Sequence, residues 1–141
     1  MEQSNSFYHI ISSENRLNKE PSPMEYEFIL PSFSSGITSS YQVEVTSFIT
    51  SDLINKENGY TILTCNGLNL NNGLCIKYGC GDMICTIPCN SYSSVGNVSF
   101  PLDCSQHNRI LKFRFLDSSY EPLGGVDVKW LLTLKFTPTY K

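Results

Sequence analysis

Six cysteines are the residues of this 141-residue chain whose type and spacing could support chemistry. Four of them lie close together in the sequence, separated by four, four and three residues: Cys75, Cys80, Cys85 and Cys89. Four thiolates can hold a structural zinc ion, and thiols can also pair as disulfides. The paired short spacing of familiar zinc sites is missing, however, and both histidines are distant in sequence. Buried free thiols that pack as small hydrophobic side chains are therefore the favoured interpretation, with a zinc or disulfide cluster as the alternative.

Catalysis by a cysteine would need a base brought close to it in the fold. His9 lies in the apolar stretch Phe7–Ile11, which predicts a packed or edge position, and His107 lies in a polar loop. Four aspartates sit beside expected turns, where Asp hydrogen-bonds the local backbone: Asp82, Asp103, Asp117 and Asp127. Because no set of nucleophile, base and orienting group can be assembled, we expect no catalytic residue, no cofactor and no enzymatic activity.

The composition favours β-structure. Charged residues make up 16% of the chain, against a usual value of about 25%, and alanine is absent. Aromatic and β-branched residues fit strands better than helices. A net charge of −3 predicts no electrostatic binding to nucleic acid. Apolar runs are far shorter than the ~20 residues of a membrane-spanning helix, and the first residues lack the pattern of a secretory signal.

Alternation of apolar and polar residues is the dominant pattern, and it is typical of strands with one solvent-exposed face. Nine strands are expected: Phe7–Ile11, Tyr26–Leu30, Tyr41–Ile49, Tyr60–Cys65, Leu74–Tyr78, Met83–Ile87, Val95–Phe100, Ile110–Phe115 and Val128–Phe136. Prolines 31, 88, 101 and 138 are expected to end strands, since proline cannot donate to a ladder. Residues 13–24 are expected to form a loop, and only Thr50–Lys56 could form a helical turn. Many short strands predict an antiparallel sandwich or barrel over residues 6–141, with residues 1–5 as a loose arm.

Both ends of the chain carry a familiar strand order. The relevant segments are Phe7–Arg16, Ser22–Pro31, Tyr41–Phe48, Leu111–Asp117 and Trp130–Phe136. Together they resemble the small jelly-roll, capsid-associated proteins of large double-stranded DNA viruses and their relatives. The resemblance implies a single jelly roll of eight or nine strands that packs in the virion against other capsid proteins, including a major capsid protein. It implies a minor capsid, cement or penton-type subunit in which Ser12, Ser13 and Arg16 form a structural turn.

Two other functions remain open. A receptor- or glycan-binding sandwich would present an exposed pocket lined by aromatic side chains. A metal-stabilised or redox protein would be built on the four clustered cysteines. Low charge and many aromatic residues suit large shared interfaces, although the same aromatics could fill the sandwich core. Edge strands, of which Tyr41–Thr50 is expected to be one, could pair with a neighbour or be blunted by their charges.

Overall fold

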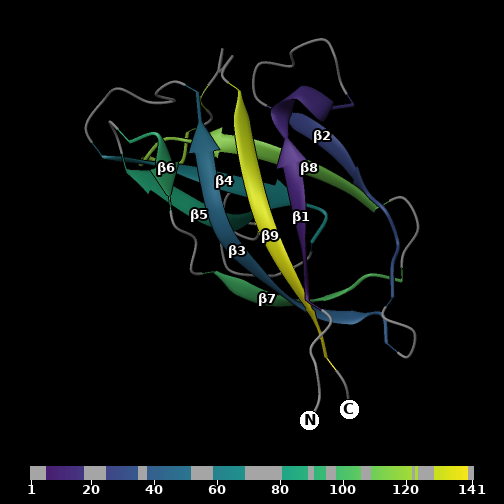
Figure 1. The fold of residues 1–141 in the computed structure, drawn as a ribbon. Helices are drawn as coiled ribbons and strands as arrows, with labels where there is room; N and C mark the ends of the chain where they lie inside the picture. The colour runs from purple at the N-terminus through teal and green to yellow at the C-terminus, as the bar shows by residue number, and fades with distance from the viewer. Residues whose placement is uncertain are drawn as a thin grey trace.

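The chain folds into two antiparallel β-sheets that pack face to face (Figure 1). The computed structural model describes residues 6–17, 25–34, 38–51, 59–68, 81–88, 91–94, 98–105, 109–121, 123 and 129–139. Its elements in chain order are β1 (Phe7–Ser12), the 3-10 helix η1 (Ser13–Asn15), β2 (Tyr26–Leu30), β3 (Ser40–Thr50), β4 (Tyr60–Asn66), β5 (Asp82–Pro88), β6 (Ser93–Ser94), β7 (Ser99–Asp103), β8 (Arg109–Leu116) and β9 (Trp130–Pro138).

Strand pairing is nested along the chain. In the described residues, the five-stranded sheet has the order β1-β9-β3-β6 with β7 also paired to β3, and the four-stranded sheet has the order β2-β8-β4-β5. The first strand thus pairs with the last, the second with the one before it, the third with β7 and the fourth with the fifth. A chain rolled up in this way is a jelly roll. The predicted antiparallel sandwich with a single jelly roll is confirmed.

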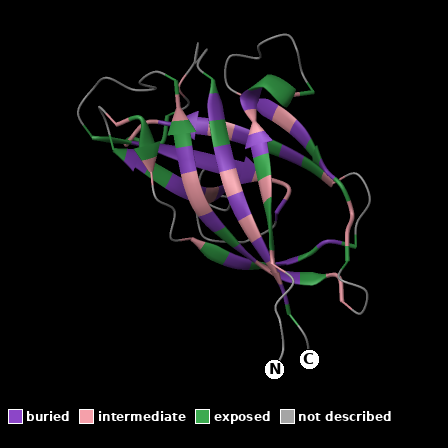
Figure 2. Ribbon diagram, viewed as in Figure 1, coloured by how far each residue is buried: buried purple, intermediate pink, exposed green. Residues whose placement is uncertain are grey.

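Aromatic side chains from both sheets fill the space between them. Alternate residues of β9 are buried from its first residue onward, and Figure 2 shows the resulting stripes on the strands. Trp130 lies at the centre of the core, 1% exposed. Its indole contacts the rings of Tyr26, Phe28, Phe48, Phe113 and Phe115 at centroid distances of 5.3 to 5.9 Å. Four of these rings belong to the opposite sheet, so one side chain joins the two layers.

The prediction that Tyr41–Thr50 lies at the edge of a sheet is wrong. This segment forms most of β3, which lies inside the five-stranded sheet between β9 on one side and β6 and β7 on the other. Its alternating buried residues, Tyr41, Val43 and Val45, face the core, which accounts for the pattern that suggested a strand. Position within a sheet depends on long-range pairing, which alternation does not encode.

Proline 101 does not end a strand as expected. The expected strand Val95–Phe100 is observed as β7, Ser99–Asp103, with Pro101 in its middle. Proline is tolerated there because β3 is the one partner of β7 among the described strands, so the missing N–H leaves no ladder bond unmade. Pro88 and Pro138 are each the last residue of their strand.

Several expected features lie outside the described residues. These are the arm at residues 1–5, the strand Leu74–Tyr78, most of the turn at Thr50–Lys56 and the first residues of the strand Val95–Phe100. The short strand β6 was not expected, and part of the expected loop at 13–24 is the helical turn η1.

The Ser-Ser-x-x-Arg turn after β1 makes four structural contacts. Ser12 caps η1 by accepting a hydrogen bond from the Glu14 amide at 3.3 Å. The hydroxyl of Ser13, itself buried, accepts a hydrogen bond from the Trp130 amide at 2.9 Å. The guanidinium of Arg16 donates to the Glu25 carbonyl and lies 4.0 Å from the centroid of the Tyr26 ring. The turn therefore fixes the end of β1 to both β9 and the start of β2.

We expect Ser13→Ala to lower the free energy of unfolding by about 1–3 kcal/mol, because it leaves the buried Trp130 amide without an acceptor. Ser12→Ala removes an exposed cap and should cost about 1 kcal/mol or less. Urea denaturation followed by near-UV circular dichroism measures both changes. Equal losses for the two variants would contradict the role assigned to Ser13.

Candidate protein-binding edge

An open sheet edge is a potential binding site because its unpaired backbone groups can pair with another chain. The edge of the four-stranded sheet at β2 is occupied. The Leu17 amide donates to the Glu27 carbonyl at 2.7 Å, and Arg16 donates to the Glu25 carbonyl at 2.5 Å. Arg16 and Leu17 thus use two of the carbonyl groups that a partner strand would need.

The other edge of this sheet, β5, is also guarded. The Ser94 hydroxyl of β6 donates to the Thr86 carbonyl at 2.7 Å, and the strand ends in Pro88. In the five-stranded sheet, the edge opposite β1 consists of the two-residue β6 and of β7. Strand β7 carries Pro101 and the charged Asp103. Short strands, prolines and charges are the usual protection against pairing with a neighbour.

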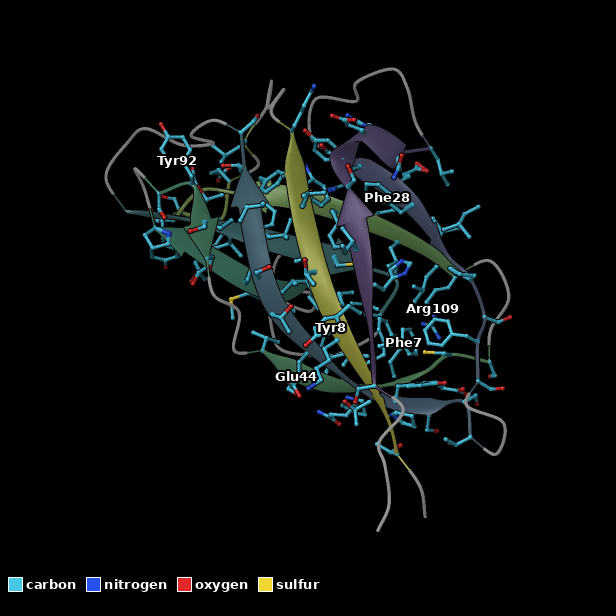
Figure 3. All side chains as sticks on the ribbon, in the orientation of Figure 1. Phe7, Tyr8, Phe28, Glu44, Tyr92 and Arg109 are labelled. Atoms are coloured by element: carbon cyan, nitrogen blue, oxygen red, sulfur yellow. The ribbon has the colours of Figure 1, made fainter. Side chains whose placement is uncertain are left out.

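Strand β1 has none of these protections. Its six residues include no proline and no Asp, Glu, Lys or Arg. Within the described part of the chain, all the strand pairing of β1 is with β9, and no other backbone hydrogen bond reaches it. Tyr8 and Ile10 point away from the core and are 62% and 58% exposed. Phe7 points the other way, against Phe33 and Phe136, and Figure 3 shows it on the opposite side of β1 from Tyr8.

A groove runs beside this open edge, between β1 and β2. It has a volume of about 250 Å³. Its lining comes from both strands and the turn between them: His9, Ile10, Ile11, Ser12, Asn15, Leu17, Phe28, Ile29, Leu30 and Leu111. Ile10, Leu17 and Ile29 are each more than two-fifths exposed. Backbone and apolar side chains are therefore available together along one side of the molecule.

His9 lies in this groove, in the half-buried edge position that the sequence predicts. Its ring meets the Phe136 ring edge-on, with 6.2 Å between the centroids. Burial lowers the pKa of His9 below its ordinary value of 6.5, so the imidazole is neutral at pH 7. No described Cys, Asp or Glu hydrogen-bonds to His9, so the described residues bring no nucleophile to this base. His107 lies outside the described residues.

The cysteines that the structure describes are buried thiols. Cys65, Cys85 and Cys104 are free and belong to the core between the sheets. Burial raises the pKa of Cys85 and of Cys104 to about 12 and raises that of Cys65 as well. The remaining members of the candidate zinc or disulfide cluster, Cys75, Cys80 and Cys89, lie outside the described residues, so the cluster stays a prediction. The described residues contain no group of three or more metal-binding side chains.

The aspartates at the ends of β7 and β8 and the basic residue Arg114 have structural partners. Asp117 accepts hydrogen bonds from the Ser119 and Glu121 amides at 2.8 and 3.0 Å, as expected for a turn residue. Asp103 similarly accepts from the Ser105 amide. Arg114, on the outer face of β8, forms an ion pair with Glu25 at 2.7 Å. This ion pair joins β8 to Glu25, the residue that precedes β2.

A second hollow, with a volume of about 330 Å³, lies on the outer face of the four-stranded sheet. It is lined by Tyr60, Ile62, Met83, Thr86 and Tyr120. Tyr120 has a φ of 67°, a conformation that costs a non-glycine residue of order 1 kcal/mol. The turn that holds it also approaches β4 closely, because a Cβ at Gly59 would lie 2.9 Å from the Ser118 hydroxyl. The fold thus places two half-exposed tyrosines beside one hollow.

Neither surface could be assigned from the sequence. The uncharged run at β1 is visible there, but only the pairing order shows that the run forms an open edge. Tyr60 and Tyr120 are 60 residues apart, and no local pattern joins them.

Comparison with known proteins adds no family assignment. No protein-family model matches the chain, and a search of curated proteins finds no significant match. None of the helical structure in the described residues is long and apolar enough to cross a membrane.

We expect the stability of the dilute protein to fall as the pH drops below about 6.5. Because the pKa of His9 is lowered in the folded state, the unfolded state binds the proton more tightly, and acid favours unfolding. The contribution of His9 is complete above pH 6.5 and is lost as the pH falls through its folded pKa.

Urea denaturation of wild type and His9→Phe between pH 7.5 and 5 measures this effect. His107 is present in both proteins, so the difference between the two curves reports on His9. We expect the wild-type curve to be steeper. Parallel curves would show that His9 is as accessible to protons as in the unfolded chain.

Proposed function

We propose that the chain is a non-enzymatic structural protein of a viral capsid, a minor capsid, cement or penton-type subunit of the virion. Its partners are neighbouring capsid subunits, including a major capsid protein. The observation that carries the proposal is the open β1 edge beside the apolar groove, because this surface can bind protein. The resemblance of both chain ends to capsid-associated jelly rolls supplies the viral context.

The physical basis of the proposed activity is β-strand addition. A partner strand laid along β1 would satisfy backbone groups, while apolar side chains such as Ile10 and Leu17 would be covered at the same time. The low charge of the chain suits such a surface, because the centres of interfaces are depleted in charged residues. The net charge of −3 favours contact with protein over contact with nucleic acid.

We expect the chain to be present in gradient-purified particles of the virus that encodes it, as measured by quantitative mass spectrometry. Ile10→Lys, which puts a charge on the open edge, should lower incorporation at least tenfold. Ile49→Lys is the matched control, because Ile49 is similarly exposed but lies in β3, an interior strand of the same sheet, and does not line the groove. Absence of the wild-type chain from the particles would refute the capsid role.

A receptor- or glycan-binding module is the second candidate, and the hollow flanked by Tyr60 and Tyr120 is the observation that favours it. Aromatic rings stack on the apolar faces of sugars, and the Thr86 side chain supplies a hydroxyl at the same hollow. The strained backbone at Tyr120 is typical of residues held in place for binding.

Tyr120→Gly tests this second candidate. Glycine adopts a positive φ without strain, so the variant should keep the turn while it removes one ring. If the hollow binds glycans, the wild type should bind spots on a glycan array and the variant should lose that signal. Tyr92→Ala, at an exposed tyrosine that does not line the hollow, should retain the signal. A silent wild-type array would count against glycan binding.

A further inference from the structure

We propose that β1 pairs antiparallel with β1 of a second copy of this chain, across a two-fold axis, so that the two five-stranded sheets become one continuous sheet. This inference rests on the proposed function in one respect, since it names the partner of the same surface. It makes a second copy of this chain the neighbour that covers β1.

The first reason lies in the backbone. In an edge strand, alternate residues direct their N–H and C=O groups away from the existing partner. For β1 these groups meet no other backbone group among the described residues, whereas two carbonyl groups at β2 and one of β5 accept hydrogen bonds from outside the sheet. An added strand is the arrangement that satisfies a row of such groups together.

The second reason lies in the side chains, which favour a copy of the same strand. Antiparallel pairing about a two-fold axis brings each residue opposite a residue of the same short segment. Like charges directly opposite one another would oppose this pairing. Strand β1 has no ionised side chain, because its one titratable side chain with a pKa near neutrality, His9, is held neutral at pH 7. Self-pairing therefore brings apolar groups together without charge repulsion.

The alternation of side chains restricts the register. In a continuous sheet, residues that face outward must lie opposite residues that face outward, so the axis has to pass through a residue of β1 and not between two residues. An axis at His9 places Tyr8 opposite Ile10 of the second copy, twice. Aromatic and β-branched residues form favourable cross-strand pairs, and these are the two most exposed side chains of the strand.

The groove supports the same arrangement. A two-fold axis perpendicular to the sheet leaves the four-stranded sheets of both copies on the same side. Leu17 and Ile29, which are exposed beside β1, then face their counterparts in the second copy. Contact between them would add apolar area to the strand pairing, which alone makes a narrow interface.

Sedimentation velocity of the purified full-length chain over a range of concentrations tests the proposal. We expect the mass of the wild type to approach twice 15.9 kDa, and Ile10→Lys to return to 15.9 kDa at every concentration. Ile49→Lys, in the interior strand β3, should remain dimeric. Far-UV circular dichroism checks that each variant is folded. A wild type that is monomeric throughout, or a dimer unaffected by Ile10→Lys, would overturn the inference.

Disulfide trapping tests the register without disrupting the strand. Directly opposed residues in antiparallel strands have Cα atoms about 4.5–5.5 Å apart, which a disulfide can bridge. His9→Cys with diamide as oxidant should therefore give a covalent dimer linked through position 9, identified by peptide mass spectrometry. Tyr8→Cys, which faces Ile10 of the second copy, should give at least tenfold less. Equal trapping at both positions would contradict an axis at His9.

The two levels of the proposal fail separately. A chain that is monomeric in solution but present in purified particles would overturn self-pairing and leave the capsid role intact. A dimer that is absent from particles would leave self-pairing intact and overturn the capsid role.

Discussion

The packing of one indole between the two sheets is the constraint on which the rest of the structure depends. Trp130 begins β9, the strand that pairs with both β1 and β3, and its ring contacts four aromatic rings of the opposite sheet. Its amide is bound by Ser13, directly after β1. Among the described residues, its buried indole nitrogen has no hydrogen-bond partner, so ring packing outweighs the cost of that group. The distance between the two sheets and the positions of the first and last strands therefore both depend on Trp130.

This constraint also decides which edges need protection. Once β9 lies between β1 and β3, the nested pairing leaves β1 at one end of its sheet and β2 at the end of the other. The chain between them makes a helical turn and then binds back onto β2 through Leu17. Among the described residues, Arg16 and Leu17 bind at the β2 edge and no backbone group binds at the outer edge of β1, so the groove lies between a partly covered strand and an open one.

The sequence predicted the strands well because alternation reports which face of each strand is buried. In the structure, the alternating apolar residues of these strands, among them Tyr26, Phe28 and Trp130, are the ones that face the core. The order of the strands in each sheet could not be predicted from the sequence, because pairing joins residues far apart in the chain. For this reason β3 was predicted to be an edge strand. Pro101 was misread since its effect depends on whether a second partner strand is present. The two surfaces that could bind a partner, the β1 edge with its groove and the hollow beside Tyr60 and Tyr120, form only when the chain has folded.

Residue-resolved hydrogen–deuterium exchange of the β1 amides, at low and high protein concentration, tests most directly whether β1 is an open edge that binds a second strand. In dilute protein, amides that face β9 should be protected while those between them exchange rapidly, and at high concentration both sets should be protected. Amides of β2 and β5 should not change. A β1 pattern that is the same at both concentrations, with all its amides protected alike, would contradict an open edge.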